Sequence, residues 1–106
     1  GKYLVQASYI QQGISGLVIS PEEGPQSLID DGLNGGKVIS LDYCFGDYDV
    51  VIIVEMPDDT SMAAFSMAAG ASGALGNIKT TVLLLMTEGF EAAKKASSMT
   101  YRPPGQ

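Results

Sequence analysis

The feature that most constrains this chain is an unbroken apolar run, Val50 to Val54, in a sequence of 106 residues. A second segment rich in β-branched and aromatic residues, Lys37 to Phe45, precedes it, and Gly46 to Asp49 separates the two. Two such segments around a tight break predict a β-hairpin. Because Val50 to Val54 is apolar at every position, both faces of this strand must be covered, as in a central strand.

Two further segments predict strands, Tyr3 to Ile10 and Lys79 to Met86. The more apolar face of the first strand holds Tyr3, Val5, Ala7 and Tyr9, and we expect it to meet the helices. In the hairpin, Ile39, Leu41, Tyr43 and Phe45 alternate with Val38, Ser40, Asp42 and Cys44. One apolar face of this kind fits a strand at the sheet edge.

Helices are predicted between and after these strands. Asp58, Asp59 or Thr60 is suited to cap a helix of mostly small residues that runs to about Ser72. Thr87-Glu88 starts a short helix that ends near Ser97. Between the first two strands, the broken pattern predicts a helix from Ile14 to Ser20, a turn over Pro21 to Gly24, and a helix from Pro25 that stops at Gly35-Gly36.

The resulting order, strand, helix, strand, strand, helix, strand, predicts an α+β fold. It is the ferredoxin-like βαββαβ two-layer sandwich, with a four-stranded antiparallel sheet, helices on one face and a short extra C-terminal helix. The first and third strands should be central. Residues 1–97 form one domain, and 98–106 form an extended tail because of Pro103 and Pro104. This tail is either frayed or a strap across a neighbouring subunit.

Composition excludes several functions. Six basic and twelve acidic residues give a net charge of −6, which disfavours nucleic acid. No apolar run reaches the roughly 18 residues of a spanning helix, so we expect no membrane partner. The single Cys44 and the absence of a signal-peptide pattern favour a cytoplasmic protein, and Cys44 itself is expected to pack as a small hydrophobe.

Several catalytic and cofactor sites are also disfavoured. The chain has no histidine, which removes the usual catalytic base and metal ligand. The glycine-rich stretch from Ala68 to Gly76 lacks the phosphate-loop motif and follows a helix instead of opening one. Glu22 and Glu23 are interpreted as two solvated charges at the bend between two helices. The alternative, a contact with a metal or a basic partner, is disfavoured. We therefore assign no catalytic residue, no metal and no cofactor.

A ligand site remains possible in a pocket between the sheet and the helices. Tyrosine hydroxyls and carboxylates there would supply hydrogen-bond donors and a base for a small apolar or aromatic compound. The candidate ligand-binding residues are Tyr9, Asp42, Tyr43, Tyr48 and Asp49. The alternative for each tyrosine is half-buried packing with the hydroxyl at the rim.

The turn motif Gly46-Asp47-Tyr48-Asp49 is interpreted chiefly as architectural. Gly46 gives backbone freedom at a tight or bulged turn. Asp47 or Asp49 is expected to accept hydrogen bonds from turn amides and so to fix the hairpin register. Paired carboxylates here would give only two ligands to a cation, too few for calcium.

The apolar strands also predict self-association. If the helices cover only one face of the sheet, the other face is open to water. The apolar residues expected to contribute to that bare face are Leu4, Val50, Ile52, Val54 and half of Val82–Leu85. Large exposed apolar patches are rare in soluble monomers. We therefore expect a homodimer or higher oligomer that packs through the open sheet face.

Short segments across nearly the whole chain, to about Lys95, carry a resemblance to other proteins: Tyr3-Leu4-Val5, Gly35-Gly36-Lys37, Phe45 to Val51, Met56-Pro57-Asp58, Ala71 to Ala74 and Lys79-Thr80-Thr81. In these segments the sequence resembles the GYD domain family of small prokaryotic proteins. The resemblance implies a ferredoxin-like fold and no settled activity. The architecture is also similar to dimeric α/β barrels, some of which are cofactor-free monooxygenases.

Two functions follow as expectations. The first is a non-catalytic homo-oligomeric module that binds a small molecule or is purely structural. The alternative is a cofactor-independent enzyme, similar to a monooxygenase or an isomerase, that acts on a small apolar or aromatic compound.

Overall fold

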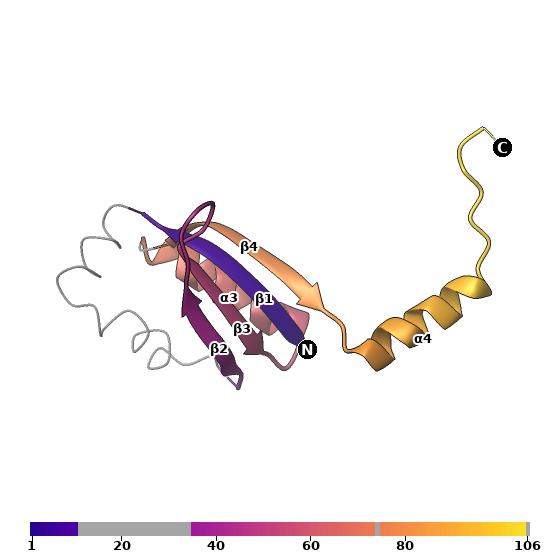
Figure 1. The fold of residues 1–106 in the computed structure, drawn as a ribbon, viewed down its shortest axis with the longest axis horizontal. Coiled ribbons are helices and arrows are strands. Elements are labelled where there is room, and N and C mark those ends of the chain that lie inside the picture. Colours follow the sequence, from indigo (N-terminus) through magenta and orange to yellow (C-terminus); the bar gives the residue numbers. More distant parts are fainter. Residues whose placement is uncertain (11–34, 74, 106) are drawn as a thin grey trace.

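A computed structural model describes residues 1–10, 35–73 and 75–105 of the chain (Figure 1). In chain order the described elements are β1 (Lys2–Tyr9), β2 (Lys37–Tyr43), β3 (Val50–Glu55), α3 (Asp59–Ala71), β4 (Leu75–Leu83) and α4 (Met86–Ser97). The fold is α+β, with one four-stranded antiparallel sheet. The helices predicted over residues 14–34 lie outside the described residues.

The strand order across the sheet is β2-β3-β1-β4. The prediction that the first and third strands are central is therefore confirmed. β1 pairs with β3 through Val5 opposite Ile52, and with β4 through Val5 opposite Thr80. The first strand of the chain thus joins the hairpin to the last strand.

The core lies on one face of the sheet, where β1 and β3 contribute alternate side chains. Tyr3, Val5 and Ala7 are buried, as predicted, and so are their cross-strand partners Val54, Ile52 and Val50. The expectation that Val50, Ile52 and Val54 lie on a bare face is wrong. The opposite face holds Leu4, Val51 and Ile53 because neighbouring strand residues point to opposite sides.

The helix α3 covers the core face (Figure 1). Asp58 is its N-cap and accepts a hydrogen bond from the Ser61 amide at 2.7 Å, so one of the predicted capping residues is confirmed. Met62 is buried and Phe65 packs against the same core. Ser66 and Thr80 share a hydrogen bond of 3.1 Å between hydroxyls, which ties α3 to β4.

The edge strand β2 departs from the alternation that its sequence suggests. Val38 is opposite Val54, yet Ser40 is opposite Ile53, so the register shifts by one residue between them. Ile39 is the extra residue of this bulge and is 48% exposed. The bulge places Val38 and Leu41 on the core face together, where the sequence pattern grouped Ile39 with Leu41. The strand also ends at Tyr43, two residues before the predicted Phe45.

The last strand and helix differ from prediction at their boundaries. β4 begins at Leu75, within the stretch expected to be a glycine-rich loop, and ends at Leu83. A second bulge separates its pairs with Gln6 and Ser8, and Asn77 nearby has a positive φ of 50°.

The predicted C-terminal helix is confirmed as α4, whose first turn is closed by a hydrogen bond from the Leu85 amide to Glu88 Oε1 at 2.9 Å.

The helix α4 extends away from the sheet, beyond the end of β4, and the chain bends in the link between the two elements (Figure 1). Every residue of α4 is exposed except Gly89, which is half-exposed. Residues 98–105 follow without a helix or strand. The chain accordingly measures 58 × 32 × 22 Å along its principal axes.

Candidate functional site

The loop from Cys44 to Asp49 closes the hairpin and holds the turn motif. The Cys44 amide donates to the Asp49 carbonyl at 2.8 Å, which closes the loop at its base. Gly46 has a φ of +125°, and a Cβ built there would meet no atom within 4 Å. The glycine is therefore required by backbone conformation and not by space, as its place in the motif predicts.

Asp49 attaches this loop to the first strand. Its amide donates to the Ala7 carbonyl at 2.9 Å, and its carboxylate Oδ2 accepts from the Tyr9 amide at 2.9 Å. The carboxylate thus binds an amide of β1, whereas the sequence predicted an amide of the turn. The Asp47 carbonyl accepts a weaker bond, 3.3 Å, from Ser8 Oγ. The motif fixes the loop against β1.

Three of the five candidate ligand-binding residues come together at this end of the sheet. The pKa of Tyr9 is raised from its ordinary value of 10.0, chiefly by burial, then by the Tyr43 side chain to which it is hydrogen-bonded and by the Asp49 charge. Tyr9 is half-buried, whereas Tyr43 is 53% exposed, so the Tyr43 ring is the more accessible of the two. We call Tyr9, Tyr43 and Asp49 the tyrosine cluster.

The other two candidates are not part of the tyrosine cluster. Asp42 is opposite Val51 in the sheet and therefore lies on the face away from Tyr43. Tyr48 is half-buried, and its carbonyl accepts a hydrogen bond from the Cys44 thiol, Sγ to O 3.2 Å. Cys44 is half-buried, and its thiol is engaged with the backbone of the loop.

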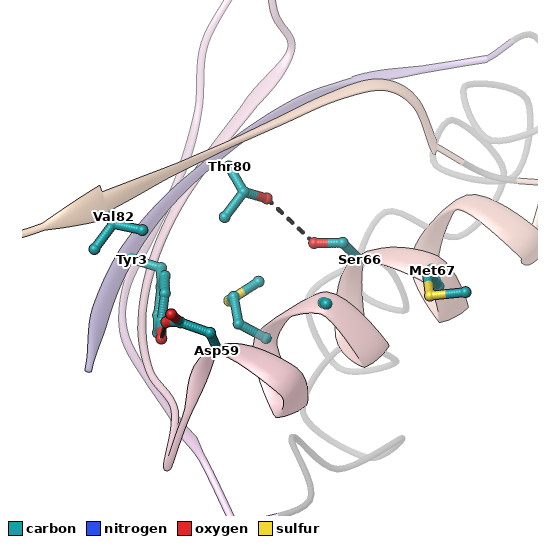
Figure 2. Close-up of a pocket in the computed structure, with 8 residues that line it drawn as sticks. Tyr3, Asp59, Ser66, Met67, Thr80 and Val82 are labelled. Atoms are coloured by element: carbon teal, nitrogen blue, oxygen red, sulfur yellow. Dashed lines mark hydrogen bonds between the residues drawn. The ribbon is translucent and has the colours of Figure 1, made fainter.

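A concave region lies between α3 and β4 (Figure 2), and none of the five candidate ligand-binding residues lines it. This α3–β4 groove has a volume of about 520 Å³. Its lining residues are Tyr3, Asp59, Met62, Ala63, Ser66, Met67, Thr80 and Val82. The small residues of α3 that the sequence showed are the available signal for it, since Ala63 leaves the space that a larger side chain would fill.

The polar atoms of the groove are paired with one another. The Tyr3 hydroxyl donates to Asp59 Oδ1, and Ser66 is bonded to Thr80 (Figure 2). The bond to Asp59 is the main cause that raises the pKa of Tyr3 to about 12, followed by burial and by the charges of Asp59, Asp58 and Glu55. Tyr3 is therefore a neutral hydrogen-bond donor and is not poised to act as a base. The rest of the lining is largely apolar, with Met62, Ala63, Met67 and Val82.

Among residues 1–10, 35–73 and 75–105, no three His, Cys, Asp or Glu side chains gather in a way that would hold a metal ion. Within the described ranges, neither helix is long and apolar enough to cross a bilayer.

No curated protein and no solved structure matches the chain. The family model of the GYD domain matches residues 3–93, which include the hairpin, its Gly46-Asp47-Tyr48-Asp49 motif, α3 and β4. The chain belongs to the GYD domain family.

Proposed function

We propose that this protein is a homo-oligomeric module of ferredoxin-like βαββαβ fold, in which a second copy covers the open face of the sheet. The strand order β2-β3-β1-β4, with α3 between β3 and β4, supports this topology. The role is non-catalytic: the module binds a small molecule or serves as a structural unit.

The observation that carries the proposal is the composition of the sheet face opposite α3. Leu4, Val51, Ile53 and Leu83 lie on this face, at the centre and on one edge of the sheet. Neither of the two described helices covers it (Figure 1). Leu4 and Ile53 are direct cross-strand neighbours, and the polar residues Lys2, Gln6, Glu55 and Lys79 share the face with the apolar group. Covering the apolar side chains is favourable by roughly 25 cal/mol per Å² of apolar surface. A second sheet packed face to face supplies that cover.

The test is sedimentation of the purified protein at micromolar concentration. The wild type is expected to sediment as a dimer or higher oligomer of the 11.1 kDa chain. The double variant Val51→Thr/Ile53→Thr keeps β-branched side chains in the strand while making the face more polar. We expect it to dissociate at a concentration at least about tenfold higher, equivalent to 1.4 kcal/mol.

The matched control is Phe45→Thr, in the hairpin loop beyond the end of β2, where the side chain is 97% exposed. It should leave the oligomer unchanged. Circular dichroism of each variant separates loss of assembly from loss of fold. A wild type that sediments only as a monomer would exclude the proposal.

For the bound molecule, the tyrosine cluster is the proposed contact. A small apolar or aromatic compound would pack on the accessible Tyr43 ring, and the Tyr9 hydroxyl would orient it. Native mass spectrometry of the protein as isolated identifies a copurified compound. Tyr43→Ala should remove it, whereas Asp42→Ala, on the other face of the same strand, should retain it.

A further inference from the structure

The C-terminal arm, Leu84 to Tyr101, carries an apolar face that touches no other described part of the chain. Met86 and Phe90 lie one helical turn apart on α4, and Ala93 continues the same side. Met86 is 90% exposed and Phe90 is 69% exposed. An isolated helix of 12 residues is only marginally stable in water. The arm therefore requires a surface that covers this face.

The exposed apolar area matches what a stable dimer needs. Eight large apolar side chains in or beside the arm and the α3–β4 groove are each more than half exposed: Met67, Val82, Leu84, Leu85, Met86, Phe90, Met99 and Tyr101. Such side chains expose on the order of 100 Å² each, and a stable interface takes about 800 Å² from each partner. The area is adequate for one reciprocal contact between two copies.

The α3–β4 groove is suited to the apolar face of this helix. Met62, Ala63, Met67 and Val82 line it, and its volume of about 520 Å³ accommodates several large side chains. Its polar atoms are already bonded in pairs, Tyr3 with Asp59 and Ser66 with Thr80. The hydroxyls of Tyr3, Ser66 and Thr80 would therefore keep their hydrogen-bond partners beneath an apolar occupant.

The arm leads away from the groove of its own chain. Leu85, between β4 and α4, is extended, with φ −62° and ψ 155°. This conformation carries α4 outward, beyond the end of β4 (Figure 1). A short extended link that projects an element from its own domain favours exchange of that element between two copies.

We propose that α4 of one copy docks in the α3–β4 groove of a second copy, with Met86 and Phe90 as its anchors. In a two-fold dimer the contact is reciprocal, so that each groove receives the helix of the partner. This inference rests on the homo-oligomer proposed above and names a second contact within it, separate from the open sheet face.

Disulfide trapping tests the contact in full-length chains that carry Cys44→Ser. A tagged chain with Ala93→Cys, on the anchor face of α4, is mixed with an untagged chain with Ala63→Cys, in the groove. Oxidation should join tagged to untagged chains, because a disulfide forms only where Cα atoms come within roughly 7 Å. The matched control is Ala92→Cys. Ala92 precedes Ala93 in the chain and lies on the opposite side of α4, so this variant should give at least about fivefold less product.

Sedimentation of a second set of variants gives an independent measurement. Phe90→Ala should raise the dissociation constant of the dimer at least tenfold, because it removes an aromatic anchor. Lys95→Ala, on the other side of the helix, should leave the constant within about twofold.

The outcomes separate this inference from the proposed function. A wild-type dimer that gives no Ala93→Cys to Ala63→Cys product overturns the docking and leaves the sheet-face contact standing. An intramolecular disulfide in a chain that carries both cysteines shows that α4 returns to its own groove, and also overturns the docking. Disulfide formation that is undiminished in Val51→Thr/Ile53→Thr supports the docking and shows that the docking does not depend on the sheet-face contact.

Discussion

The two described helices of this protein are similar in length and opposite in environment. In α3, Met62 is 2% exposed and packs on the sheet; in α4, Met86 is 90% exposed and packs on nothing described. The same side chain is therefore a core residue in one helix and a surface residue in the other. What differs is the available partner surface, since the core face built by β1 and β3 lies directly beneath α3. Apolar composition specifies that a helix should be covered, whereas topology decides whether its own chain can cover it.

The sharpest test of this contrast is truncation of one large side chain in each region. Ile52→Ala, beneath the core, should lower the free energy of unfolding by about 2–5 kcal/mol because it leaves a cavity among buried residues. Phe90→Ala should change it by less than about 0.5 kcal/mol at protein concentrations where the chain is monomeric. Urea unfolding of both variants measures the two values. Equal losses would mean that α4 packs within its own chain.

The second test concerns the attachment of the hairpin loop to the core side of the sheet. Asp49→Ala removes the acceptor of the Tyr9 amide and should cost about 1–2 kcal/mol, because that amide loses its partner in a half-buried position. Asp42→Ala, which removes an exposed carboxylate from the other face of the hairpin, is the control and should cost less than about 0.5 kcal/mol. Thermal unfolding compares them, and an unchanged midpoint for Asp49→Ala would contradict the architectural role of the motif.

The third test compares the caps of the two helices. Asp58→Ala should lower the unfolding temperature by a few degrees, because α3 is part of the cooperative core. Glu88→Ala should fray α4 and leave that temperature unchanged at low protein concentration.

The Asp58 cap also has an acid dependence that can be checked in the same experiment. The Ser61 amide holds the pKa of Asp58 below its ordinary 3.8. The contribution of the cap is therefore complete above pH 3.8 and is lost as the pH falls through the lower folded value. Asp58→Ala should remove this part of the acid dependence, and identical acid profiles for variant and wild type would rule it out.

The fourth and smallest effect is expected only in alkali. Because the pKa of Tyr3 is raised from 10.0 to about 12, its hydrogen bond to Asp59 stabilises the fold fully below pH 10.0 and is lost as the pH rises through about 12. Tyr3→Phe should flatten the fall of the urea midpoint across this window. Parallel curves for the two proteins would show that the bond adds nothing to stability.

Much of the sheet could be predicted from the sequence because its signals are local. The apolar run of β3, the alternation of β1 and the Asp58 cap each follow from a few neighbouring residues. The face to which β3 turns Val50, Ile52 and Val54 could not be predicted, because a strand that is apolar throughout carries no alternation. That choice is made by pairing with Tyr3, Val5 and Ala7 across the sheet.

The candidate site was predictable only in part. Tyr9, Tyr43 and Asp49 meet because β1 and β2 flank β3, which is a matter of strand order. The bulge at Ile39 determines which β2 residues share the core face, and it carries no glycine or proline signal in the sequence. The residues that line the α3–β4 groove could not be predicted, because they are set by the spacing between two elements and not by a motif within either.

The central position of β1 has a consequence for how the chain acquires its fold. β1 is synthesised before both of its partners, about 50 residues before β3 and about 75 residues before β4. Its two edges are paired only when both of these strands are present. Contacts of such large sequence separation slow folding because long loops must close first. During synthesis on a ribosome the unpaired edges of β1 remain open to other chains until β4 emerges. Arrest of translation between β3 and β4 should therefore give an aggregation-prone nascent chain, and release after β4 should end that vulnerability.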